Sequence, residues 1–107
     1  MEPVNRKQLL AQVKKGDVIL LDVRPSDEYA KAHLPFAVSV PISELQKELK
    51  NLPKNKEIVA YCRGPYCFFA KEAVELLRKK GFRASRLKDG IHEWASHGLP
   101  VENQQEA

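Results

Sequence analysis

Short apolar runs alternate along the chain with segments in which apolar residues recur every three or four positions. The runs predict β-strands at residues 18–23, 37–40, 58–61 and 84–87. The periodic segments predict helices at residues 5–13, 27–29, 44–50, 69–80 and about 91–98. This alternation is typical of an α/β domain in which a mainly parallel central sheet, here of about five strands, is flanked by helices.

Local signals set some of the expected element ends. Gly81 ends the helix that starts near residue 69, because glycine favours the position just past a helix. Ser43 and Gln46 have the spacing of a capping box, which predicts a helix beginning at Glu44. The last residues, 102–107, are expected to form a frayed tail.

The composition predicts one globular domain spanning residues 1–107, with its core at about residues 3–101. Of the 107 residues, 43% are hydrophobic and 30% are charged, which is enough to bury a core without disulfides. No apolar stretch approaches the ~20 residues of a membrane span, and the first residues lack the apolar segment of a secretory signal. Two cysteines without an export signal suggest a reducing compartment, so we expect a cytoplasmic protein.

The net charge of +4 does not predict direct nucleic-acid binding by this domain. Its basic clusters, residues 14–15 and 78–80, lie in the last turns of predicted helices, where the helix dipole favours cations. No aromatic residues alternate with a basic stripe, and no base-reading motif is present. The charge instead indicates a mild preference for anionic small molecules.

The most informative segment is residues 58–80, where a predicted strand delivers Cys62 into a short turn that opens onto a helix. A thiol at such a junction lies near the unpaired N–H groups and the positive dipole end of the helix, which favour the nucleophilic thiolate. The alternative is that Cys62 only packs in the core, as most free cysteines do. Gly64 and Pro65 make the following segment a constrained loop, so we favour a reactive, catalytic Cys62.

Charged residues follow the ends of two other predicted strands. Asp22 and Arg24 lie on the same side of one strand, and Asp89 follows the last strand. Because ligands gather at the carboxyl ends of parallel strands, these residues and Cys62 are candidates for one site. We expect Asp22 and Arg24 to form a structural ion pair that supports the loops, with Glu28 as a candidate third member, since charges at a packed sheet edge need partners.

Other candidate side chains are expected to have structural or surface positions. Neither His33 nor His92 has a sequence neighbour that would make it a base, and Trp94 is expected to pack the last helix onto the sheet. Two cysteines with a distant histidine fall short of the usual four zinc ligands. We therefore expect no metal, and no organic cofactor.

Four segments in chain order resemble the rhodanese-like family, over about residues 3–101. LLDVRPSDEY at 20–29 is similar to its Asp-Val-Arg…Glu-Tyr signature, and AHLPFAVSVP at 32–41 resembles its Gly-His-Ile-x-Gly-Ala…Ile-Pro segment. YCRGPYC at 61–67 occupies the place of the catalytic loop, and LKDGIHEW followed by GLPV resembles the closing motif. The CRGPYC hexapeptide especially resembles rhodanese domains fused to winged-helix regulators of the arsenic-repressor type.

The resemblance implies a single rhodanese-like domain that acts as a thiosulfate sulfurtransferase. The Cys62 thiolate would take sulfane sulfur from a donor such as thiosulfate, become a persulfide, and pass the sulfur to a thiol or to cyanide. The resemblance also implies that the substrate-binding cradle is the loop backbone of Arg63, Gly64, Pro65, Tyr66 and Cys67. A phosphatase of the Cys-x5-Arg type is a poor fit, because Phe68 occupies the arginine position and cannot clamp a phosphate.

Two loop residues leave alternatives open. Arg63 either attracts an anionic donor or is a solvated loop arginine. Cys67 is a possible resolving cysteine that attacks the Cys62 persulfide and leaves a disulfide, or else a small apolar residue at the helix start, which we favour slightly. The family usually has glycine where Ala32 and Phe36 stand, so the loop between them is expected to be bulkier here.

A second class of function fits the same cysteines. In a longer transcriptional regulator, Cys62 and Cys67 would detect sulfane sulfur, an oxidant or a metalloid, since reversible sensing favours a close cysteine pair. The partner would then be a covalently linked winged-helix DNA-binding domain, rather than a membrane. As an enzyme, the domain would instead meet a small anionic sulfur donor and a thiol acceptor.

Overall fold

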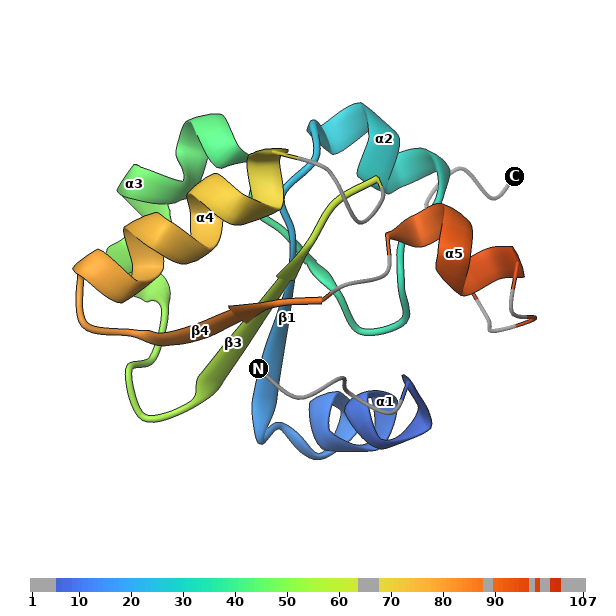
Figure 1. The fold of residues 1–107 in the computed structure, drawn as a ribbon, viewed down its shortest axis with the longest axis horizontal. Helices are drawn as coiled ribbons and strands as arrows, with labels where there is room; N and C mark the ends of the chain where they lie inside the picture. The colour runs from blue at the N-terminus through green and yellow to red at the C-terminus, as the bar shows by residue number, and fades with distance from the viewer. Residues whose placement is uncertain (1–5, 64–67, 88–89, 97, 99–100, 103–107) are drawn as a thin grey trace.

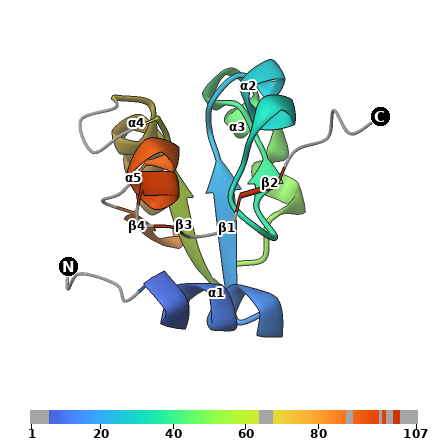
Figure 2. The ribbon, with the colours of Figure 1, turned by 90° about the vertical axis from the view of Figure 1, so that its right-hand side faces the viewer.

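The computed structural model describes residues 6–63, 68–87, 90–96, 98 and 101–102, which form a parallel sheet with helices on both faces. In chain order the elements are α1 (Arg6–Lys15), β1 (Val18–Asp22), α2 (Ser26–Lys31), β2 (Val38–Ser39), η1 (Ile42–Glu44), α3 (Leu45–Glu48), η2 (Leu49–Asn51), β3 (Glu57–Tyr61), α4 (Phe68–Lys79), β4 (Arg83–Arg86) and α5 (Ile91–Ser96). The strand order is β2-β1-β3-β4 (Figure 2). The predicted α/β class is confirmed, with four strands in the described residues against the expected five or so.

The sheet carries an apolar core on each face. On one face α3 and α4 cover alternate strand residues such as Ile58 and Ala60, and on the other α1 and α5 cover Val59 and Tyr61 (Figure 1). Trp94 of α5 is fully buried, as predicted. Burial on both faces explains why the central strands are apolar runs without a polar alternation. Among the described residues, no helix is long and apolar enough to cross a membrane.

Backbone angles show where glycine is used in the left-handed region and where another residue takes that conformation. Gly81 follows α4 with φ of +91°, in the left-handed region that glycine adopts at little cost. Phe36 also lies in this region, with φ of 65°, at a position where the resemblance leads us to expect glycine. A side chain there costs about 1–2 kcal/mol. Ala32, at the other expected glycine, has extended backbone with φ of −166° and is not strained.

The predicted capping box at Ser43 and Gln46 is wrong. The expected helix is divided into η1, α3 and η2, and neither η1 nor α3 has a side-chain hydrogen bond at its cap. The segment begins earlier, because Pro41 sets the turn and its carbonyl oxygen accepts a 2.8 Å hydrogen bond from the Glu44 N–H. This tight turn takes the place of the capped helix start expected at Glu44.

The predicted frayed tail is wrong at its first residue. Glu102 forms an isolated antiparallel bridge with His33, in which each backbone N–H donates to the other residue's carbonyl oxygen at 2.8 Å. The contact joins residues far apart in the sequence, which is why local patterns gave no sign of it. Residues 103–107 lie outside the described part of the chain.

Candidate functional site at the carboxyl edge of the sheet

The carboxyl ends of β1 and β3 lie side by side and bring the predicted site residues together. Asp22 and Tyr61 are register partners at the last pair of the two strands. Arg24 and Cys62, which follow them closely, therefore lie at the same edge of the sheet, where ligands of parallel sheets bind. The predicted convergence of Asp22, Arg24 and Cys62 is thus present, whereas Asp89 lies outside the described residues.

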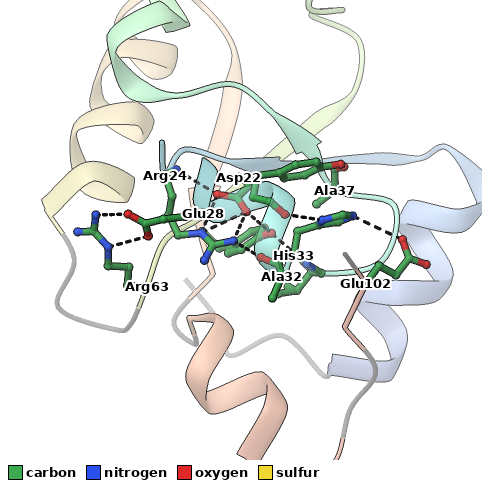
Figure 3. Close-up of polar contacts among 11 residues, drawn as sticks. Asp22, Arg24, Glu28, Ala32, His33, Ala37, Arg63 and Glu102 are labelled. Atoms are coloured by element: carbon green, nitrogen blue, oxygen red, sulfur yellow. Dashed lines mark hydrogen bonds and ion pairs between the residues drawn. The ribbon is translucent and has the colours of Figure 1, made fainter. Parts of the chain in front are cut away.

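Arg24 holds the Asp22 carboxylate through backbone and side chain together (Figure 3). Its N–H and Nε donate to Oδ1 at 3.0 Å each, and Nη2 donates to Oδ2 at 2.6 Å. The side chains are 5% and 0% exposed, so this is the buried ion pair that the spacing of the two residues predicts. Nη2 also donates to the Ala32 carbonyl oxygen at 2.5 Å, which ties the segment after α2 to the end of β1.

Tyr61 completes this buried network and is a residue that the sequence patterns did not single out. Its hydroxyl donates to Asp22 Oδ2 at 2.7 Å and accepts from the Leu34 N–H at 3.0 Å. Burial, and then the negative charge of Asp22, raise the pKa of Tyr61, so the hydroxyl remains a donor at neutral pH. A usable signal was present, since a tyrosine that ends a buried strand needs a partner for its O–H.

His33 joins the segment after α2 to the chain near its end. The side chain is buried, Nδ1 donates to the Tyr29 carbonyl oxygen at 2.8 Å, and the ring stacks on Tyr29 with centroids 3.8 Å apart. Nε2 lies 3.7 Å from Glu102 Oε1 (Figure 3). Both histidines were expected to have structural or surface positions. These contacts give His33 a structural position, whereas His92 is exposed at the surface.

Cys62 directly follows β3, as predicted, and α4 begins further along the chain at Phe68. The residue is only 1% exposed and belongs to the apolar cluster that includes Ala70 and Ala73 of α4. Its sulfur is disulfide-bonded, and Cys67 lies outside the described residues. Such burial is what the packing alternative predicts, whereas attack on a donor needs an accessible thiolate. Nucleophilic use of Cys62 therefore requires that the disulfide be reduced and the sulfur exposed.

Arg63 makes a two-pronged ion pair with Glu28 of α2. Nε donates to Oε1 at 2.9 Å and Nη2 donates to Oε2 at 2.5 Å (Figure 3). Hydrogen bonds from Arg63 hold the pKa of Glu28 below its ordinary value, and the charge of Arg24 acts in the same direction. Glu28, expected as a third member of the Asp22–Arg24 pair, thus directs its hydrogen bonds to the residue next to Cys62.

The remaining predicted cradle residues are outside the described part of the chain: Gly64, Pro65, Tyr66 and Cys67. Their predicted role in binding a donor therefore stays a prediction. Within the described residues, no group of three or more histidine, cysteine, aspartate or glutamate side chains is placed to hold a metal ion. Among the described residues, the candidate site thus consists of Cys62 and two arginine–carboxylate pairs, Asp22–Arg24 and Glu28–Arg63.

Comparisons with known proteins point to one family. The sequence model of the family described as rhodanese-like domain matches residues 5–97 of this chain. The HTH-type transcriptional regulator Rv0324 of Mycobacterium tuberculosis is 45% identical over 101 residues, covering 94% of this chain but 45% of the regulator. A sulfurtransferase of Allochromatium vinosum is 34% identical over 86 residues, covering 79% of this chain and 78% of that protein. The crystal structure of the BH2092 protein of Bacillus halodurans has a TM-score of 0.83 at 35% identity, covering 92% of this chain and 74% of that one.

Proposed function

This chain belongs to the rhodanese-like domain family, and we propose that it is a sulfurtransferase in which Cys62 carries sulfur as a persulfide. The family supports the reaction class, because the Allochromatium vinosum relative named a sulfurtransferase matches over most of its length. The observation that carries the proposal is the position of Cys62. It follows the last residue of β3, at the sheet edge where Asp22 ends β1, and it shares an apolar cluster with α4.

The proposed reaction has two sulfur transfers. The reduced Cys62 thiolate attacks the outer sulfur of thiosulfate; a sulfur–sulfur bond to Cys62 forms, the bond to the sulfonate sulfur breaks, and sulfite leaves with its electron pair. An acceptor thiolate then attacks the outer sulfur of the Cys62 persulfide, takes that sulfur as a new persulfide, and restores the Cys62 thiolate. With cyanide as acceptor the product is thiocyanate. Thiosulfate as donor and a thiol as acceptor are parts of the proposal.

The described residues have supporting roles in this reaction. The buried network of Asp22, Arg24 and Tyr61 holds the ends of β1 and β3 in one arrangement, so the residue after Tyr61 has a defined position. Burial disfavours a thiolate, and the positive N-terminal end of α4 can compensate for this cost. The 12-residue α4 begins at Phe68, shortly after Cys62 in the chain.

Sulfur loading tests the proposal directly. The protein is reduced, freed of reductant, treated with thiosulfate and measured by intact-mass spectrometry. One added sulfur is expected, and cyanide should remove it. Cys62→Ser should load no sulfur, while the matched variant Cys67→Ser should still load one. An unchanged mass of the reduced wild-type protein, or loading of Cys62→Ser, would overturn the assignment of Cys62.

A second candidate function is sensing within a longer regulator. Two observations favour it: the 45% identity to an HTH-type transcriptional regulator of which this chain spans less than half, and the disulfide at Cys62. In this alternative, oxidation of Cys62 and Cys67 to a disulfide is the signal, and a linked winged-helix domain that binds DNA is the partner. Cys67→Ser should then lose the disulfide but keep sulfur transfer. Loss of transfer in Cys67→Ser would place Cys67 in the transfer reaction and count against sensing.

A further inference from the structure

Arg63, the residue after Cys62, carries a positive charge that is paired with a carboxylate. The Arg63 side chain is 48% exposed, but two of its N–H groups point at the Glu28 carboxylate of α2 (Figure 3). A guanidinium has five N–H donors in a planar fork, so three remain available while Glu28 is bound. The ion pair nevertheless cancels the charge that would attract an anion.

A second group, the Phe69 ring, holds the Arg63 guanidinium near the start of α4. The Arg63 Cζ lies 5.5 Å from the centroid of the Phe69 ring, within the range of a cation–π contact. Phe69 is the second residue of α4, so the guanidinium lies between α2 and α4. Without Glu28, the aromatic contact would still keep the cation at the beginning of α4.

Arg24, the other arginine at this edge, is not available to an anionic ligand. It is 4% exposed, and its Nε and Nη2 donate to the Asp22 carboxylate and the Ala32 carbonyl oxygen. Freeing Arg24 would leave a buried carboxylate without its cation, which is strongly destabilising. Freeing Arg63 has a much smaller effect, since exposed ion pairs contribute little to stability.

We propose that Glu28 is a positioning residue that lowers the affinity of the site for dianionic sulfur donors by competing with them for the Arg63 guanidinium. This inference rests on the proposed sulfur transfer at Cys62. A dianion such as thiosulfate has to displace the Glu28 carboxylate, or bind beside it against its charge. A donor with one negative charge is repelled less by the Glu28 carboxylate, so Glu28 lowers its affinity less. Glu28 therefore tunes the selection between donors by their charge.

The test compares two donors that transfer the same sulfur atom. Thiosulfate carries two negative charges and leaves as sulfite, whereas methanethiosulfonate carries one and leaves as methanesulfinate. We expect Glu28→Gln, which keeps the side-chain size, to raise kcat/KM for thiosulfate about two- to fivefold. The rise for methanethiosulfonate should be smaller, and kcat/KM for dithiothreitol as the uncharged acceptor should not change. The thiosulfate gain should shrink as salt is raised towards about 1 M.

Two variants make the comparison specific. Asp27→Asn removes an equal charge from the neighbouring residue of α2, whose effect on Arg63 acts through its field alone. It should therefore change the ratio of the two donors less than Glu28→Gln does. In an Arg63→Ala background, Glu28→Gln should alter that ratio much less, because the guanidinium for which Glu28 competes is gone.

The outcomes separate this inference from the proposed function. If the wild-type protein transfers no sulfur from either donor, the proposed function fails. If wild-type transfer is normal but Glu28→Gln lowers kcat/KM equally for both donors, the ion pair only supports the loop and the inference is wrong. An equal response of Glu28→Gln and Asp27→Asn would also overturn it, because general charge would then explain the effect.

Discussion

Two arginine–carboxylate pairs lie at the same edge of the sheet in opposite environments. Asp22 and Arg24 are close neighbours in the chain and buried, whereas Glu28 and Arg63 come from different elements and are partly exposed. Both pairs use Nε and Nη2 of the arginine to hold a carboxylate. Geometry alone would therefore assign them the same role.

The environments give the two pairs different properties. Breaking a buried ion pair is strongly unfavourable, because the remaining charge has no water to solvate it. An exposed pair exchanges its partner for water or for another anion at little cost. The Asp22–Arg24 pair is therefore suited to holding the strand ends, and the Glu28–Arg63 pair to responding to a ligand. Three measurements test this contrast.

The largest effect is expected from breaking the buried pair. Arg24→Ala leaves the Asp22 carboxylate buried beside Tyr61 without its cation, which should lower the free energy of unfolding by about 3–5 kcal/mol. Urea denaturation at neutral pH measures this loss. Arg86→Ala, which removes an exposed arginine at the end of β4, is the control and should change stability by less than about 0.5 kcal/mol. Similar small losses in both variants would contradict the contrast.

A smaller effect is expected from removing one hydroxyl of the buried network. Tyr61→Phe keeps the ring but leaves Asp22 Oδ2 and the Leu34 N–H without this partner, so the free energy of unfolding should fall by about 1–3 kcal/mol. Tyr29→Phe removes a half-buried hydroxyl that donates to the Ala37 carbonyl oxygen at 2.7 Å. Its cost should be about 0.5–1.5 kcal/mol. Equal costs would mean that burial does not distinguish the two sites.

The smallest effect is expected at the exposed pair and depends on pH. The folded-state pKa of Glu28 lies below its ordinary value of 4.5, so its contribution is fully present above that value and is lost as pH falls through the folded pKa. Glu28→Gln should therefore lower the free energy of unfolding by less than about 1 kcal/mol at neutral pH. At low pH, with Glu28 protonated, the two proteins should be equally stable by urea denaturation. A difference that persisted in acid would show that the substitution disturbs more than the ion pair.

Patterns along the chain were sufficient to predict the class of fold and the gathering of Asp22, Arg24 and Cys62 at one edge of the sheet. Hydrophobic periodicity depends on near neighbours, so it located the apolar strands, the amphipathic α4 and the junction that carries Cys62. The period of two along a strand likewise predicted that Asp22 and Arg24 share a side. Local signals were wrong where a neighbour competed with them, as at the capping box after Pro41.

The choice of partners among distant residues depended instead on how the elements pack. Glu28 and Arg63 are 35 positions apart, and Asp22 and Tyr61 are 39 apart. The Asp22–Tyr61 contact follows from the parallel register of β1 and β3, and the Glu28–Arg63 contact joins α2 to the chain after β3; no local pattern contains either. The burial of Cys62 has the same origin, because α4 packs on the sheet at that point. Residue type therefore indicated which groups are candidates for chemistry, while packing determined which of them are shielded and which are exposed.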